Sequence, residues 1–145
     1  LERTGALAEA LAVYQKAIAL EPENGEYYHN LGFLYYRQGN ELEAEKQYRN
    51  SLARNPRQVE PYFNLGGLYL DQGHYERAVS AYKESLALNP EYSDAWINIA
   101  SAFLKLGRND KVVEAYQRAL GLDLDPALRL RVERQLEALE TVGGG

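Results

Sequence analysis

Residues 25–58 read GEYYHNLGFLYYRQGNELEAEKQYRNSLARNPRQ, and residues 59–92 read VEPYFNLGGLYLDQGHYERAVSAYKESLALNPEY. The two stretches carry the same residue types at the same places, 34 positions apart, and residues 93–126 continue the pattern. Two columns keep this step through the chain: Tyr14, Tyr48, Tyr82 and Tyr116, and Gly5, Gly39, Gly73 and Gly107. A fixed period of this length indicates a protein built from repeated structural units.

Each unit is expected to begin with a helix. One face of this helix is defined by the spacing of four positions: an aromatic residue, a Leu or Ile, a small residue and a second aromatic residue. In the first complete unit these four are Tyr28, Leu31, Gly32 and Tyr35. The glycine column then ends the helix, because a residue without Cβ adopts positive φ at low cost.

A second helix is expected after the glycine. In the first complete unit its packing face carries Ala44, Tyr48, Ser51 and Leu52. Pro56 and its counterparts Pro22 and Pro90 end this helix, because proline lacks the amide donor that would continue it. Every unit is therefore a pair of helices.

These columns resemble the tetratricopeptide repeat family, whose pattern is an aromatic, Leu-Gly, an aromatic, Ala, an aromatic, Ala and a closing Pro. The resemblance implies an all-α fold, a right-handed superhelical solenoid of antiparallel helix pairs. It divides the chain into a half repeat at 1–24, complete repeats at 25–58, 59–92 and 93–126, a capping helix at 127–140 and a flexible tail at 141–145.

The two ends depart from the repeat. Gly5 is expected to be the hinge glycine of the first repeat, so most of that repeat's first helix is absent and the next helix keeps an uncovered apolar face. At the other end Asp125-Pro126 provides an N-cap and a first helical residue. The apolar stripe of the capping helix comprises Leu128, Val132, Leu136 and Leu139. A polar outer face beside such a stripe suits the end of a solenoid.

Composition excludes several classes of protein. Of the 145 residues 46% are hydrophobic and 26% charged, which is typical of soluble globular chains. No apolar stretch approaches the ~20 residues that span a bilayer, and the start of the chain does not read as a signal peptide, so we expect no membrane insertion and favour a cytoplasmic over a secreted protein. The net charge of -5 argues against nucleic-acid binding. The chain lacks methionine, so we expect a fragment or a processed product.

No catalytic constellation is visible. The two histidines, His29 and His74, lie at different positions of the repeat, which argues against a shared metal or acid-base site. The chain has no cysteine, and its glycines lie at helix ends rather than in a phosphate loop. We therefore expect neither an enzyme nor a bound cofactor.

The candidate binding residues are those that face the concave side. In stacked hairpins the first helix of each pair lines that side, so residues outside the packing columns point into the groove. They are Glu26, His29, Asn30, Phe33, Tyr36 and Arg37, then Glu60, Phe63, Asn64 and Leu70, then Asp94, Ile97, Asn98, Ser101 and Lys105.

Asn30, Asn64 and Asn98 form one column of this groove. An asparagine amide both donates and accepts, so it can bind a peptide backbone of any sequence. The resemblance implies the same role, since similar asparagines hold extended peptides in other arrays of the family, including those of O-linked N-acetylglucosamine transferases. The alternative is that each asparagine only bonds a neighbouring helix.

Glu26, Glu60 and Asp94 place an acid at the start of each groove helix. They would select basic or neutral ligands, or they only complement the helix dipole. The relatives that clamp carboxylate tails with lysines are a poor match, because the residues before the asparagines are His29, Phe63 and Ile97.

The pattern as a whole predicts a protein-protein interaction scaffold that binds an extended, partly apolar peptide of another protein in its concave groove. Two alternatives stay open. One is a self-assembly module, a homo-oligomer formed through the uncovered helix at residues 6–20. The other is the targeting arm of a larger enzyme such as a glycosyltransferase.

Overall fold

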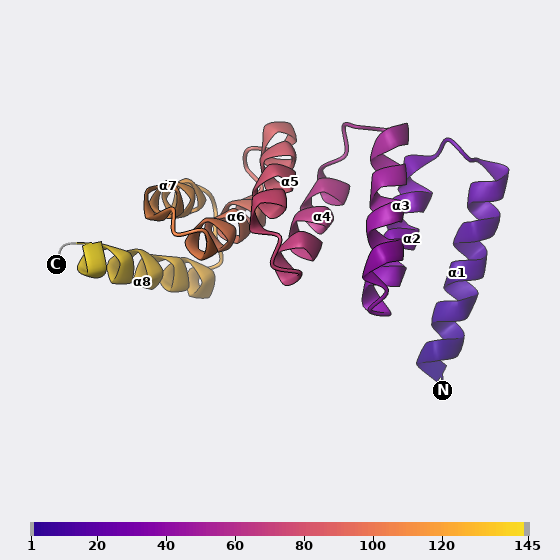
Figure 1. Cartoon of the computed structure of the whole chain (residues 1–145), viewed down its shortest axis with the longest axis horizontal. Helices are drawn as coiled ribbons and strands as arrows, with labels where there is room; N and C mark the ends of the chain where they lie inside the picture. The colour runs from indigo at the N-terminus through magenta and orange to yellow at the C-terminus, as the bar shows by residue number, and fades with distance from the viewer. Residues whose placement is uncertain (1, 144–145) are drawn as a thin grey trace.

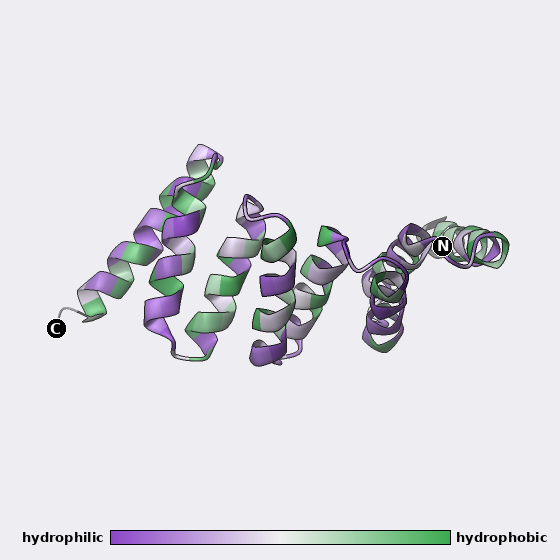
Figure 2. Cartoon of the chain, turned by 90° about the horizontal axis from the view of Figure 1, so that it is seen from above, coloured by the Kyte–Doolittle hydropathy of each residue, from purple (hydrophilic) through white to green (hydrophobic). Residues whose placement is uncertain are grey.

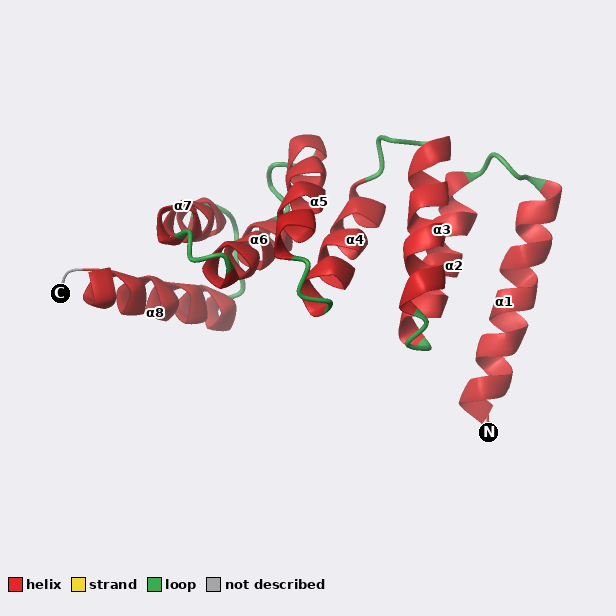
Figure 3. Cartoon of the chain, in the orientation of Figure 1, coloured by secondary structure: helices red, strands yellow, loops and turns green. Residues whose placement is uncertain are grey.

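The computed structural model of the chain describes residues 2–143, which fold into eight helices joined by short loops (Figure 3). The helices are α1 (Glu2–Leu20), α2 (Gly25–Arg37), α3 (Glu41–Arg54), α4 (Val59–Asp71), α5 (Tyr75–Leu88), α6 (Ser93–Lys105), α7 (Asn109–Leu120) and α8 (Pro126–Gly143). No strand occurs within residues 2–143. The predicted all-α fold is confirmed.

The helices pack as antiparallel pairs in chain order. α2 packs on α3, α4 on α5 and α6 on α7, and each pair stacks on the next through α3 with α4 and α5 with α6. Figure 1 shows the resulting elongated array, with the two ends of the chain far apart and the helix axes turning progressively from α1 to α7. α4 also touches both α2 and α6, so these three first helices share one side of the array, here called the inner face.

Glycine sets the turn inside each pair. Gly39, Gly73 and Gly107 have φ of 78°, 78° and 73°, a region that residues with a Cβ rarely adopt. These three confirm the predicted hinge column. Gly5 does not follow them: it lies inside α1, which continues back to Glu2. The expectation of a hinge at Gly5 is wrong, because the chain before it is helical.

Glycine also sets how closely the two helices of a pair approach. A Cβ on Gly66 would lie 2.6 Å from Cε1 of Tyr82, and one on Gly32 would lie 2.8 Å from Cδ1 of Tyr48. Both tyrosines are 0% exposed. In Figure 2 apolar and polar residues alternate along the helices, so each helix turns an apolar side to its neighbours. One cluster of buried hydrophobic residues extends from Ala44 of α3 to Leu136 of α8.

The array ends in a capping helix. Oδ2 of Asp125 accepts hydrogen bonds from the backbone amides of Ala127 (3.2 Å) and Leu128 (3.4 Å), as expected of an N-cap. Val132 and Leu136 are buried against the core. α8 continues to Gly143, so residues 141–143 of the expected flexible tail are helical instead, and residues 144–145 lie outside the described part of the chain.

α1 is less covered than its counterparts. Ala10, Tyr14 and Ala17 are only partly buried. The residues at the same repeat positions in α3, namely Ala44, Tyr48 and Ser51, are all 0% exposed. The difference follows from packing, because α3 packs along its pair partner α2, whereas α1 packs on α2 from outside that pair.

Candidate functional site

The inner face contains a cavity of about 140 Å³, here called the inner cavity. It lies where α2, α4 and α6 meet, with α3 behind them. Its lining comprises Phe33, Tyr36, Tyr48, Phe63, Asn64, Gly67, Leu68 and Asn98. Two of the three predicted asparagines are therefore in one cavity.

Buried tyrosine hydroxyls lie beneath the inner cavity. The Tyr48 hydroxyl makes no hydrogen bond among the described residues, although its side chain is fully buried. The Tyr82 hydroxyl is as deeply buried and makes no well-formed hydrogen bond there, but the Asn98 side chain lies close enough to lower its pKa against the effect of burial. Burial raises the pKa of each, so both stay protonated and able to donate. A Cβ on Gly67 would lie 3.7 Å from the Tyr82 hydroxyl, so the missing side chain leaves this oxygen close to the cavity.

Asn64 is held in place by His29. Nδ2 of Asn64 lies 2.8 Å from Nε2 of His29, and the His29 ring packs on Tyr48 with 5.8 Å between centroids. Burial lowers the pKa of His29 below its ordinary value of 6.5 and outweighs the opposite effect of Glu60 and Glu26. The neutral imidazole accepts from the Asn64 amide, whose carbonyl oxygen remains available to a ligand.

Asn30 lies in a different cavity. This acidic cavity, of about 590 Å³, lies between the starts of α2 and α4. It is lined by Glu23, Asn24, Gly25, Glu26, His29, Asn30, Asn55, Gln58 and Glu60. The asparagine column is thus divided between two cavities, with His29 lining one and bonded to Asn64 in the other. Three carboxylates make the end near Asn30 negative.

The apolar candidates differ in how accessible they are. Phe33 and Tyr36 are 45% and 39% exposed, and the Tyr36 hydroxyl donates to Oδ2 of Asp71 at 3.0 Å. Phe63 is less accessible to a ligand, because its ring packs on Tyr92 with 4.7 Å between centroids. Phe33 and Tyr36 therefore offer exposed apolar surface beside the inner cavity that a ligand could cover.

Several predicted residues lie apart from the two cavities. Ile97 is 7% exposed and belongs to the core, which corrects the expectation that its side chain faces the groove. Ser101 donates back to the carbonyl of Ile97 at 3.4 Å. The others that line neither cavity are Arg37, Leu70, Asp94 and Lys105.

Two side chains that line the inner cavity, those of Tyr48 and Leu68, were absent from the sequence prediction. Both are fully buried, and the repeat pattern assigns Tyr48 to a packing column. Its hydroxyl nevertheless reaches the inner face from the second helix. The signal in the sequence is the type of residue, since a tyrosine in an apolar column brings a polar atom that a phenylalanine would not.

Over residues 2–143 no three His, Asp or Glu side chains gather where they could hold a metal ion. None of the described helices combines the length and the apolar character needed to cross a membrane.

Models of known families match almost the whole sequence. A model described as TPR repeat matches residues 3–39, and two described as tetratricopeptide repeat match residues 23–91 and 63–128. The sequence matches no curated protein.

Solved structures share the fold. A crystal structure of MamA superposes with a TM-score of 0.85 at 22% identity, covering 99% of this chain and 82% of that one. The type III secretion translocator chaperone SycD of Yersinia enterocolitica gives 0.76 at 19% identity, covering 83% and 86%. A complex of SycD with a peptide of the translocator YopD gives 0.76 at 20% identity, covering 81% and 93%.

Proposed function

Because the chain belongs to the tetratricopeptide repeat family and is therefore a protein-interaction module, we propose that its inner face binds an extended, partly apolar peptide segment of another protein. The proposal assigns no catalytic step to the chain. SycD, which shares the fold, has been crystallised with a peptide, and this precedent supports the proposal.

The observation that carries the proposal is the polar lining of the inner cavity. Asn64 and Asn98 line the same cavity as Tyr48, whose buried hydroxyl lacks a partner within the described chain. An extended backbone presents both amides and carbonyls, and it can pair with amide side chains and hydroxyls at once. A buried hydroxyl without a partner costs free energy, which a bound backbone carbonyl would recover.

The surroundings of the two cavities suggest which peptides fit. Phe33 and Tyr36 supply exposed aromatic surface beside the inner cavity, which favours an apolar side chain in the ligand. Glu23, Glu26 and Glu60 make the acidic cavity attractive to a Lys or Arg. We therefore expect a ligand with an apolar centre and a basic residue on the side that reaches Asn30.

The test starts from peptides selected by the protein itself. A displayed library of random peptides is panned against the wild-type chain, and the affinity of one selected peptide is measured by calorimetry. Replacing Asn64 and Asn98 together by alanine should weaken binding about tenfold or more, since each neutral hydrogen bond contributes about 1 kcal/mol. Asn30→Ala alone should have a smaller effect, because Asn30 lies in the other cavity.

A matched control is available on an outer helix. Within residues 2–143 the side chain of Asn50 in α3 bonds only Gln47 of its own helix, so Asn50→Ala tests the same chemical change away from the inner face. This variant should bind the selected peptide as the wild type does. If the double variant at Asn64 and Asn98 keeps full affinity while remaining helical, the inner face is not the peptide site.

The second candidate function is self-association, and the exposure of α1 favours it. The face formed by Ala10, Tyr14 and Ala17 is partly exposed, whereas its counterparts in later repeats are closed by a pair partner. Val13 and Leu20, which are 64% and 75% exposed, add apolar surface to the same helix. A helix of a second copy would bury this surface.

Sedimentation velocity over a range of concentrations tests the second candidate. The wild type should associate reversibly, and Ala10→Glu should shift it to monomer, because the substitution places a charge on the apolar face. Gln15→Glu, at an exposed position of the same helix, is the control and should associate normally. A wild type that stays monomeric at the highest concentration would exclude self-association through α1.

A further inference from the structure

Two related cavities lie on the side of the helix pairs away from the inner face. One, of about 390 Å³, is bounded by α5, α6 and α7 and is here called the outer pocket. The other, of about 670 Å³, is bounded by α3, α4 and α5. The repeat relates their linings, since Lys83, Trp96 and Phe103 of the outer pocket correspond to Arg49, Tyr62 and Tyr69 of the α3–α5 cavity. The two therefore allow a comparison within one chain.

The outer pocket has an apolar floor and one aromatic wall. Leu86, Ile99 and Phe103 form the buried floor. Trp96 is partly exposed, and its Nε1 donates to the carbonyl of Pro90 at 2.8 Å, which fixes the indole ring. The volume of the outer pocket falls in the ~300–1,000 Å³ range of ligand pockets. The pocket is large enough and apolar enough to accept a big side chain.

The α3–α5 cavity is neutralised by its own residues. Arg49 donates through Nε to Oε1 of Glu45 at 3.1 Å and through a terminal nitrogen to the Tyr69 hydroxyl at 2.6 Å. The Tyr69 hydroxyl in turn donates to Glu45. Glu76 and Glu84 line the cavity beside Arg77, and Glu76 also pairs with Arg108. With Glu45, the carboxylates around this cavity therefore match the cations in number.

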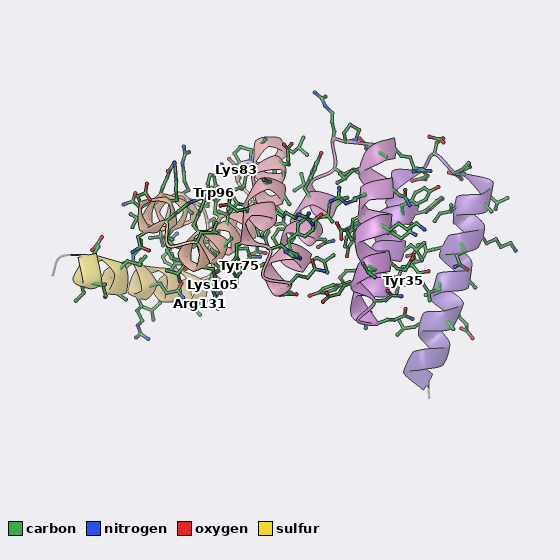
Figure 4. All side chains as sticks on the ribbon, viewed as in Figure 1. Tyr35, Tyr75, Lys83, Trp96, Lys105 and Arg131 are labelled. Carbon is green, nitrogen blue, oxygen red and sulfur yellow. The ribbon has the colours of Figure 1, made fainter. Side chains whose placement is uncertain are left out.

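The outer pocket lacks this compensation of charge, because the residues at three repeat positions differ. Val79 replaces Glu45, Phe103 replaces Tyr69, and Arg118 replaces Glu84. Lys111 pairs with Glu114 at 3.5 Å, whereas Lys83 and Arg118 make no ion pair within residues 2–143. The Arg118 guanidinium instead lies 5.6 Å from the centre of the Trp96 ring. Figure 4 labels Lys83 and Trp96 close together at this pocket.

We propose that the outer pocket is a second binding site, separate from the inner face, which takes an apolar or aromatic side chain of an acidic peptide segment of another protein. The floor would bury the side chain, and Lys83 and Arg118 would pair with carboxylates on either side of it. A local excess of cations on a chain of net charge -5 makes this site selective for acidic segments. The inner face, with its acidic cavity, favours the opposite charge.

Trp96 is the only tryptophan of the chain, so its fluorescence reports on the outer pocket directly. The probe is a peptide capped at both ends, with Phe-Leu at its centre and two aspartates on each side. Titration of the full chain should give a saturable change in tryptophan emission. Two comparison peptides should give little response: one with lysines in place of the aspartates, and one with Ser-Gly in place of Phe-Leu.

Paired charge reversals locate the binding site. The double variant Lys83→Glu and Arg118→Glu should bind the acidic probe about tenfold more weakly, because two attractive contacts become repulsive. The control is Lys46→Glu with Arg77→Glu, which changes the net charge equally on exposed residues outside the outer pocket. It should leave the affinity unchanged, and circular dichroism should show that both variants are folded.

Three results would overturn the proposal. The first is equal affinity of the acidic probe for the Lys83 and Arg118 double variant and for the wild type. The second is no saturable response to the acidic probe, or an equal response to the lysine peptide. The third is a response to decanoate alone, which would assign the pocket to a small amphiphile. Alanine at Asn64 and Asn98 should not affect the titration with the acidic probe. The proposals for the outer pocket and for the inner face are therefore tested independently.

Discussion

Asn64 of α4 pairs with His29 of α2, 35 positions earlier, through a contact of 2.8 Å between Nδ2 and Nε2. The contact joins two successive inner helices and requires a neutral imidazole, because Nδ2 can only donate. Burial favours the same neutral form and lowers the His29 pKa. One titratable contact therefore links adjacent repeats at the floor of the groove.

Stability should fall on mild acidification because of His29. Its pKa in the folded chain lies below the 6.5 of the unfolded chain, so between these values the unfolded state binds more protons. The stabilisation is complete above 6.5, is lost as the pH falls through the interval, and stays lost below the folded pKa. Urea unfolding at about pH 7.5 and about pH 5 measures the loss.

His29→Phe is the matched variant for this experiment. Phe63 occupies the same position in the next repeat and packs on Tyr82 with 5.8 Å between centroids, as His29 packs on Tyr48. The variant should fold and should lose less stability between the two pH values than the wild type does. Equal losses in the two proteins would show that other groups cause the pH dependence.

Gly66→Ala should destabilise the chain by about 2–3 kcal/mol, the cost of overpacking a close contact. Its Cβ would lie 2.6 Å from the fully buried Tyr82 ring, which cannot move aside without opening the α4–α5 pair. Gly5→Ala is the control, because nothing lies within 4 Å of a Cβ there and the position is helical. That variant should gain up to about 1 kcal/mol in urea unfolding.

Tyr48→Phe should leave stability unchanged or raise it by about 1 kcal/mol, because the deleted hydroxyl has no partner within the described chain. The same variant should lower the affinity for the selected inner-face peptide several-fold if that hydroxyl binds the ligand. Urea unfolding and calorimetry measure the two effects separately. A clear loss of stability would mean that the hydroxyl already makes a structural bond.

Asp125→Ala should cost about 1 kcal/mol and should loosen α8 in particular, because this side chain caps the helix through two backbone amides. Asp123→Ala is the control: Asp123 is exposed and makes no side-chain hydrogen bond within residues 2–143. Amide hydrogen exchange should show faster exchange in α8 for the first variant alone. Uniform exchange in both would mean that the cap does not hold this helix.

The fold could be predicted because each helix pair satisfies the same constraints. The turn glycines need positive φ, and Gly32 and Gly66 need a small residue against a tyrosine ring, so these residue types recur with the period. Gly5 shows the limit of that argument. A glycine in the right column bends the chain only when a helix ends there, and the local sequence around Gly5 continues the helix.

The candidate site was harder to predict, because it depends on which side chains reach a shared space. Ile97 and Asn98 are neighbours in the sequence, yet Ile97 is in the core and Asn98 lines the inner cavity. The outer pocket depends on differences between repeats rather than on what they share. Because Val79 stands where Glu45 stands in the earlier repeat, Lys83 has no carboxylate partner at that position. That this cation lies beside an apolar pocket can be seen only from the packing of α5 on α6.

Within residues 2–143 each helix pair contacts the pairs beside it, and no contact between helices joins one end of the array to the other. Local opening should therefore begin at the ends, and first at α1, where no residue from Gly5 to Leu20 is fully buried. A peptide bound across α2, α4 and α6 would contact three successive helix pairs at once and would restrain their motion relative to one another. Its binding should slow hydrogen exchange in all three helices together, including in residues that it does not touch.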